Sequence, residues 1–140
     1  MLRKIFYTGS HSIWENLALL ILRLVAGSFM LTHGWGKIVK LLEGPLYEFS
    51  NPIGLGASLS LILVAFAEGI CAVCVALGIA VRLTTIPIMI TMAVAAFVAH
   101  ANDAFFAKEM PLMYFTMFLV IAIIGAGKFS IDRLLESRKL

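Results

Sequence analysis

The sequence predicts an all-α membrane protein, a bundle of four antiparallel transmembrane helices formed by a single chain of 140 residues. Its composition is 61% hydrophobic and only 14% charged, with a mean hydropathy of +1.01, far outside the range of a soluble domain of this size. The apolar residues also gather into four segments. Each segment is long enough to cross a hydrocarbon core of about 30 Å at 1.5 Å per helical residue.

The first span is expected from Trp14 to Trp35. The helix between these residues rises about 31 Å, which would place one indole in each interfacial belt. A cleaved signal peptide is the alternative, because Arg3 and Lys4 precede the apolar run. We favour an uncleaved helix, since Arg23 interrupts the run and no small-residue cleavage site precedes the polar HGWGK segment.

The other three spans are expected at 56–81, 83–99 and 111–126. Little more than Arg82 joins the second span to the third, so these two helices should lie side by side. The connection from Gly36 to Leu55 contains proline and glycine, but it is too apolar for a free loop. We expect it to form a folded loop on the outer side that packs over the mouth of the bundle.

The whole chain, residues 1–140, is expected to form one domain, with residues 128–140 as an amphipathic tail on the inner leaflet. The positive-inside rule predicts that both termini are cytoplasmic. Seven Lys or Arg residues fall on the side of the termini and three on the other: Arg3, Lys4, Arg82, Lys128, Arg133, Arg138 and Lys139 against Lys37, Lys40 and Lys108. The excess of basic residues therefore reflects membrane topology. The sequence has no basic run interleaved with aromatic residues, the pattern that would indicate nucleic-acid binding.

Two charged side chains fall inside the predicted spans, Arg23 in the first and Glu68 in the second. An arginine at the centre of a helix costs roughly 2.5–3.5 kcal/mol, so Arg23 needs a partner or a hydrated cavity. Counted from the outer ends of their spans, both residues lie about 15–18 Å deep, which predicts that they pair. Gly27, on the same helix face as Arg23, leaves room for the pair or for a ligand. The pair would either fix helix register or orient a ligand and handle protons, and both interpretations stay open.

Histidines mark the outer ends of two spans, with His33 ending the first and His100 the third. Separately, each is typical of an interfacial side chain that reaches toward water. Together with Lys37 and Glu68, they would line a path from the outer surface to mid-membrane, suited to exchanging protons with a redox head group. The sequence contains no H-x-x-x-H pair, no haem ligand pair and no Gly-rich nucleotide motif, so we predict no metal, haem or nucleotide.

Cys71 and Cys74 form a C-A-V-C motif, which allows a thiol-redox interpretation. We favour a packing role, because the apolar surroundings of a helix in lipid disfavour the reactive thiolate. Cys71 shares a helix face with Glu68 at spacing i, i+3, so a redox role stays open.

Four stretches carry a resemblance to a known family: RLVAGSFMLTHGWGK (23–37), AEGICAVCVALGIAVR (67–82), AHANDAFFAKE (99–109) and GAGKFSID (125–132). In this order they resemble the DoxX family of small bacterial four-span membrane proteins, from about Leu17 to Asp132. Ala126 stands where the family usually has a proline, which alters how the fourth helix stops. The resemblance implies a quinone- or thiol-linked redox role, with links to sulfur metabolism and oxidative stress, in the bacterial inner membrane.

We therefore expect a membrane component of a redox system that binds a quinone, a quinol or a similar lipid-soluble redox molecule. The candidate catalytic residues are Glu68, His33 and His100, and the candidate cofactor-binding residues are Arg23, Glu68, Lys37 and Gly27. Such a component would need a redox partner protein as electron donor, and a homo-oligomer would enlarge the small volume inside four helices. Two alternatives stay open: a non-enzymatic membrane anchor for a redox partner, and a small transport or lipid-binding module.

Overall fold

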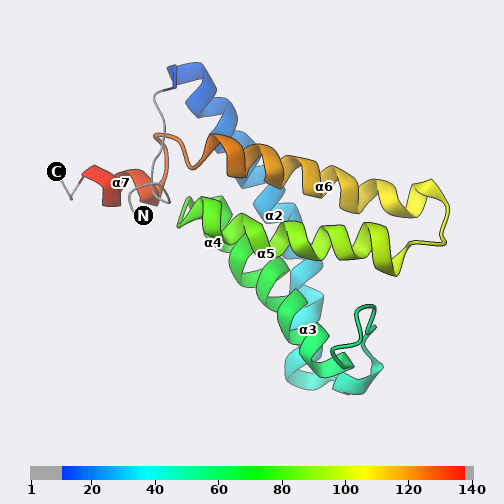
Figure 1. Ribbon diagram of the computed structural model, residues 1–140. Coiled ribbons are helices and arrows are strands. Elements are labelled where there is room, and N and C mark those ends of the chain that lie inside the picture. Colours follow the sequence, from blue (N-terminus) through cyan, green and yellow to red (C-terminus); the bar gives the residue numbers. More distant parts are fainter. Residues whose placement is uncertain (1–10, 138–140) are drawn as a thin grey trace.

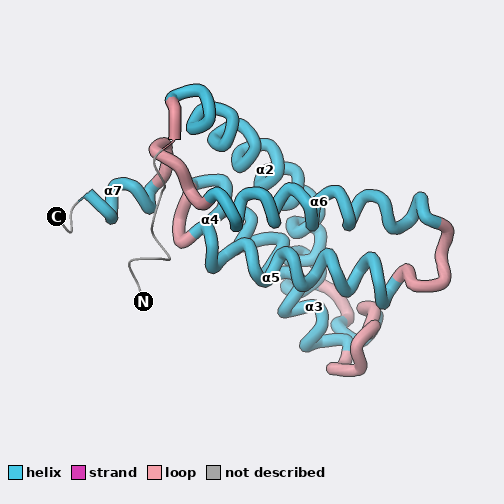
Figure 2. The backbone as a smooth tube through the Cα atoms, turned by 45° about the horizontal axis from the view of Figure 1, so that its top comes forward, coloured by secondary structure: helices cyan, strands magenta, loops and turns pink. Residues whose placement is uncertain are grey.

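The computed structural model of the protein describes residues 11–137. Within that range the chain folds into helices joined by short connections, with no strand (Figure 1, Figure 2). Four helical stretches are long and apolar enough to cross a membrane: Ile13–Glu43, Ala57–Leu77, Val81–Ala99 and Phe105–Ile124. The predicted all-α class with four spans is confirmed, and the protein is an integral membrane protein.

Two of the spans contain a π-helical segment. The first span is α2 (Ile13–Glu43), and the second joins α3 (Ala57–Ala65), the π-helical η2 (Phe66–Cys71) and α4 (Ala72–Leu77). The third joins α5 (Val81–Val94) to the π-helical η3 (Ala95–Ala99), and the fourth is α6 (Phe105–Ile124). The short η1 (Leu46–Glu48) lies between the first two spans, and α7 (Ile131–Ser137) follows the last.

Helix α2 is longer than predicted. It begins after Ser12, whose hydroxyl accepts a hydrogen bond from the backbone N–H of Glu15, while the Glu15 carboxylate accepts one from the backbone N–H of Ser12. The helix continues beyond Trp35 and stops at Gly44. The prediction of an end near Trp35 is wrong, because the chain reaches its first helix-breaking pair only at Gly44 and Pro45.

The second span ends earlier than the predicted 56–81, because the chain turns directly after Leu77. Gly78 (φ 78°) and Ala80 (φ 45°) both adopt the left-handed backbone conformation, which ends α4 and redirects the chain into α5. Helix α5 begins immediately after this turn, slightly before the predicted 83–99.

The fourth span starts and ends earlier than the predicted 111–126. Helix α6 begins at Phe105, so Pro111 lies inside the helix and not at its first position, and it ends at Ile124. The expectation that Pro111 starts the helix is wrong because the residues between Phe105 and Pro111 include good helix formers. At the other end, Gly125 (φ 98°) stops the helix.

The helices form two hairpins, α2 with α3–α4 and α5 with α6. The two hairpins lie together near α7. They diverge toward the loop that joins α2 to α3 and the loop that joins α5 to α6 (Figure 1). The end that carries residues 11–16, 78–80 and 125–137 is named the terminal end, and the end that carries residues 44–56 and 100–104 the loop end. Both ends of the described chain lie at the terminal end, as four spans require. Arg3, Lys4, Arg138 and Lys139, on which the topology prediction partly rests, lie outside the described residues.

Small residues bring α2 close to the second span. A Cβ added at Gly27 would lie 2.9 Å from both the Ala72 oxygen and the Ala76 Cβ, so the two backbones are almost in contact there. Larger buried side chains, including Phe118 on α6 and Ile88 on α5, fill the space between the hairpins near the terminal end. This packing fixes the terminal end and leaves the loop end open for a cavity.

Candidate functional site

Arg23 and Glu68 do not form the predicted pair. The Arg23 guanidinium is fully buried, and it donates through Nη1 to the carbonyl of Ala126 and through Nη2 to that of Phe129. Glu68 forms an ion pair with Lys37. The prediction that Arg23 and Glu68 meet at one depth is therefore wrong.

The error comes from the end assigned to α2. Glu68 lies level with Gly34, since a Cβ at Gly34 would meet the backbone of Glu68 and Gly69. Arg23 lies level with Gly78, where a Cβ would be 2.6 Å from Arg23 Nη1. Arg23 and Gly34 are 11 residues apart, a rise of about 16 Å along α2. The predicted depth of Arg23 was counted from His33, as if the helix ended there. Because α2 continues past Trp35 to Glu43, that count placed Arg23 too close to the end of the helix.

The surroundings of Arg23 are those of a structural clamp at the terminal end. Asp132, only 1% exposed, accepts hydrogen bonds from the backbone N–H groups of Ala80 (2.7 Å) and Val81 (3.0 Å) at the start of α5. Its negative charge also attracts the nearby positive charge of the Arg23 guanidinium. Asn16 on α2 accepts a hydrogen bond from Lys128 N–H at 2.7 Å. The segment from 125 to 132 thus ties three spans together.

Asp132 was missed as a partner of the first and third spans. It is separated from Arg23 and Ala80 by many residues, and single-sequence spacing carries no signal for such contacts. Its position as the last residue of GAGKFSID was the available hint, because a short polar residue there can accept hydrogen bonds from a neighbouring helix start.

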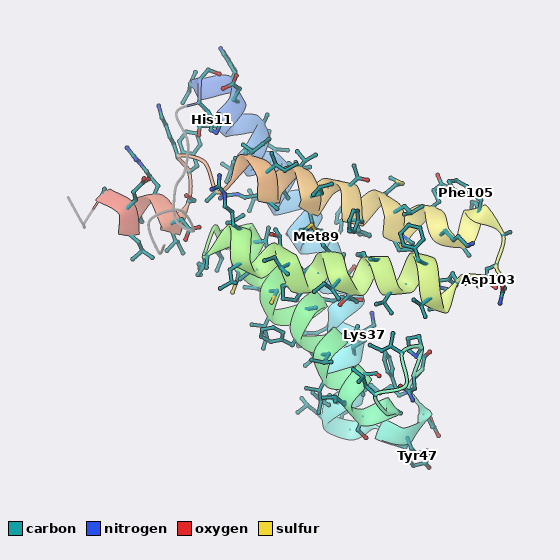
Figure 3. All side chains as sticks on the ribbon, in the orientation of Figure 1. His11, Lys37, Tyr47, Met89, Asp103 and Phe105 are labelled. Carbon is teal, nitrogen blue, oxygen red and sulfur yellow. The ribbon has the colours of Figure 1, made fainter. Side chains whose placement is uncertain are left out.

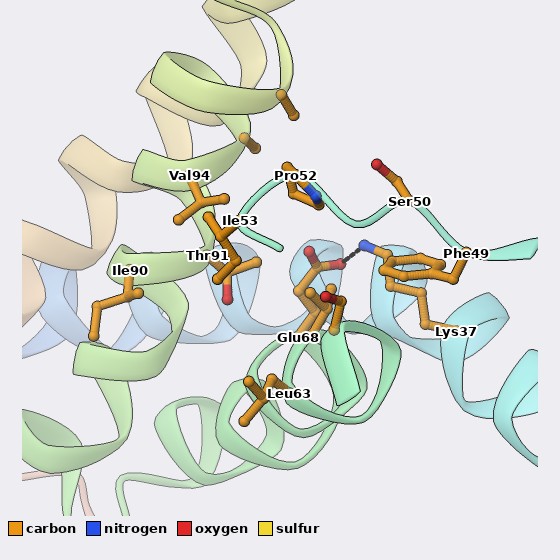
Figure 4. Close-up of a pocket in the computed structure, with 14 residues that line it drawn as sticks. Lys37, Phe49, Ser50, Pro52, Ile53, Leu63, Glu68, Ile90, Thr91 and Val94 are labelled. Atoms are coloured by element: carbon orange, nitrogen blue, oxygen red, sulfur yellow. Dashed lines mark hydrogen bonds and ion pairs between the residues drawn. The ribbon is translucent and has the colours of Figure 1, made fainter. Parts of the chain in front are cut away.

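Lys37 and Glu68 form a partly buried ion pair (Figure 4), and Lys37 lies where the two hairpins separate (Figure 3). Glu68 lies on η2 and its side chain is 3% exposed, whereas that of Lys37 is 27% exposed. Gly34 permits the pair, since a Cβ there would lie 2.6 Å from the nitrogen of Gly69. Lys37 is one turn further along α2 on the same face, so the close approach at Gly34 brings it to Glu68.

A cavity of about 210 Å³ opens on one side of this ion pair, between α3–η2 and α5–η3. Its lining is almost entirely apolar, apart from Lys37, Glu68 and a few hydroxyl groups. Residues 49–53 cover it at the loop end (Figure 4). The predicted packing of this connection over the mouth of the bundle is confirmed. This space is named the lipid-side cavity.

A second cavity, of about 170 Å³, lies on the other side of the same ion pair, between α2, η3 and α6. His33, His100 and Tyr114 line it together with Lys37 and Glu68, and it is named the histidine cavity. The His33 ring meets the Tyr114 ring edge-on, with 5.7 Å between centroids. His100 Nδ1 lies 2.7 Å from a carboxylate oxygen of Asp103 on the exposed loop.

The structure therefore brings four of the six candidate residues together: His33, Lys37, Glu68 and His100. Arg23 belongs to the clamp, and Gly27 is in contact with α4. Cys71 packs in the core and Cys74 is partly buried, both as free thiols. Between residues 11 and 137, no group of three or more His, Cys, Asp or Glu side chains is placed to hold a metal ion.

Four apolar spans with a buried ion pair between two cavities define a small multi-pass membrane protein. Residues 18–101, more than half of the chain, match the DoxX family, and the chain belongs to that family. It has no match among curated proteins or among solved structures.

Proposed function

We propose that the Lys37–Glu68 pair is the head-group site for a quinone, a quinol or a similar lipid-soluble redox molecule. The observation that carries this proposal is an ion pair with a buried carboxylate, that of Glu68, lining an almost wholly apolar cavity in a membrane-spanning bundle. Ionisable groups inside a membrane are costly, and they commonly mark ligand or proton sites. The DoxX resemblance points to the same class of ligand.

The residues present fit such a head group. A cavity of about 210 Å³ is smaller than the 300–1,000 Å³ usual for ligand pockets, so it suits one ring and not a large molecule. The Lys37 ammonium can donate to a ring carbonyl, and the Glu68 carboxylate can accept from a ring hydroxyl. A bound quinone would supply reversible two-electron, two-proton chemistry.

The histidine cavity suits proton exchange with water. Glu68 lines both cavities, so its carboxylate can take up a proton at the ligand side and release it toward His33. His100 sits beside the exposed Asp103 in the connection at the loop end. An imidazole ring can both accept and donate a proton, which suits these two side chains to pass the proton to water.

We place this activity in the bacterial inner membrane with both termini in the cytoplasm, and we link it to sulfur, thiol or oxidative-stress metabolism. A redox partner protein would supply or accept the electrons. Arg23 and Gly27 are not part of this proposed site, because their contacts hold helices together.

Binding of a decyl-tailed benzoquinone to the protein in lipid nanodiscs tests the proposal. We expect the double variant Lys37→Met/Glu68→Gln to raise the Kd at least about tenfold, the size expected for a lost hydrogen bond to a charged group. Both residues are changed together because removing one partner leaves an uncompensated buried charge.

The matched control is Lys40→Met/Glu43→Gln, which makes the same substitutions one turn further along α2 and outside the two cavities. It should bind the quinone as the wild type does. An equal Kd for all three proteins would refute the proposed site and favour a role of the pair in helix packing, as in a membrane anchor.

A further inference from the structure

We infer that the ligand reaches the Lys37–Glu68 pair sideways from the bilayer, between α3 and α5. The ligand class is then a single-ring redox head group with an apolar tail that stays in the lipid. This inference rests on the proposed function and adds the route of the ligand and the position of its tail.

The wall of the lipid-side cavity between α3 and α5 is also part of the outer surface of the bundle. Leu63 on α3 and Ile90 on α5 both line the cavity, yet Leu63 is 45% exposed and Ile90 is 59% exposed. In Figure 4 these two side chains lie on one side of the cavity and Lys37 on the other. A tail that leaves the head group toward Leu63 and Ile90 therefore reaches the surface of the bundle.

This opening lies at the depth of the acyl chains. Ile90 precedes the end of η3 at Ala99 by nine residues, a distance of about 14 Å along the helix. Leu63 follows the start of α3 at Ala57 by six residues, or about 9 Å. Each half of a hydrocarbon core is about 15 Å thick, so both residues face lipid tails and not water.

The loop end of the same cavity is covered. Phe49, Pro52 and Ile53 lie across it (Figure 4). Asn51 holds this segment to the start of α3, because its side-chain oxygen accepts hydrogen bonds from Gly56 N–H (3.0 Å) and the Ser60 hydroxyl (3.4 Å). A water-soluble ligand approaching from the loop end would have to displace this segment, whereas a lipid-soluble ligand does not.

The ligand and the proton then enter through different cavities. The lipid-side cavity takes its ligand from the bilayer, and the histidine cavity lies toward the exposed 100–104 loop. The Lys37–Glu68 pair lines both and separates them. An apolar tail and a proton therefore reach Glu68 from different sides.

Placing a large side chain in the lateral opening tests the inference. We expect Ile90→Trp and Leu63→Trp each to raise the Kd of a decyl-tailed benzoquinone at least tenfold in nanodiscs. The Kd of the same benzoquinone without the tail should change less than twofold, because Lys37 and Glu68, which hold the head group, are unchanged. Leu83→Trp is the control, since Leu83 is 55% exposed on the same helix but does not line the cavity.

An unchanged Kd for the tailed ligand in both variants, or an equal loss for both ligands, would show that the tail does not lie between α3 and α5. The lateral route would then fall, while the head-group site would stand. A wild type that binds neither ligand would refute the proposed function itself, and the lateral route with it. A loss restricted to the tailed ligand, absent from Leu83→Trp, would establish that the tail lies between α3 and α5, the position that the lateral route requires.

Discussion

A methyl group added at Gly34 would meet the backbone of η2, 2.6 Å from the nitrogen of Gly69. The same addition at Gly36, two residues further along α2, would meet nothing within 4 Å. Glycine is therefore required at the first position for close helix approach and not at the second. The contact at Gly34 sets the distance between Lys37 and Glu68.

Gly34→Ala and Gly36→Ala should accordingly have opposite effects. Overpacking at Gly34 is expected to lower the free energy of unfolding by about 1–3 kcal/mol and to weaken quinone binding by moving Lys37 away from Glu68. Gly36→Ala should raise the free energy of unfolding by about 0.5–1 kcal/mol, because alanine is a better helix former than glycine. Denaturant unfolding in detergent measures the stability of the two variants, and Kd measurements in nanodiscs measure their quinone binding. Similar stabilities and Kd values for the two variants would contradict the close contact at Gly34.

At the scale of elements, the sequence predicted helices more reliably than helix ends. Composition and apolar run length were sufficient for four spans, since lipid allows few other folds. The end of α2 was misplaced because the indole at Trp35 was taken as an interfacial marker, whereas Gly44 and Pro45 stop the helix. That error moved Glu68 to the depth of Arg23 and hid its pairing with Lys37.

The two π-helical segments were not predicted at all. Glu68 lies on η2 and Ala95 begins η3, and both residues line both cavities. Such segments occur frequently at functional sites. They depend on the backbone hydrogen-bonding pattern, which has no simple signature in residue spacing.

The contact between α7 and the start of α5 gives an element-scale prediction. Asp132→Asn removes the carboxylate that accepts two backbone N–H groups and faces Arg23, so we expect the free energy of unfolding to fall by about 1–3 kcal/mol. Asp103→Asn makes the same change at an exposed contact with His100 and should cost less than about 1 kcal/mol. Denaturant unfolding of the purified variants measures both. Equal losses would show that the clamp does not hold α7 to the bundle.

At the scale of the whole molecule, a fixed terminal end and a divergent loop end assign different roles to the charged residues. Arg23 and Asp132 stabilise the end where the spans converge. Lys37, paired with Glu68, lies where they separate (Figure 3). The sequence predicted a role for Glu68 because a charge within a span is unusual. It added Lys37 and the two histidines because they lie at the outer ends of the predicted spans. It could not assign partners, which depend on where distant segments meet.

The central claim, a quinone-type ligand at the Lys37–Glu68 pair, is tested most directly by what the protein carries from its own membrane. Purified wild type, Lys37→Met/Glu68→Gln and Lys40→Met/Glu43→Gln would be extracted with organic solvent and the small molecules identified by mass spectrometry. We predict a tailed quinone enriched with the wild type and with the Lys40/Glu43 control, and lost from the Lys37/Glu68 variant. Bulk lipid alone, in equal amounts from all three proteins, would contradict the account.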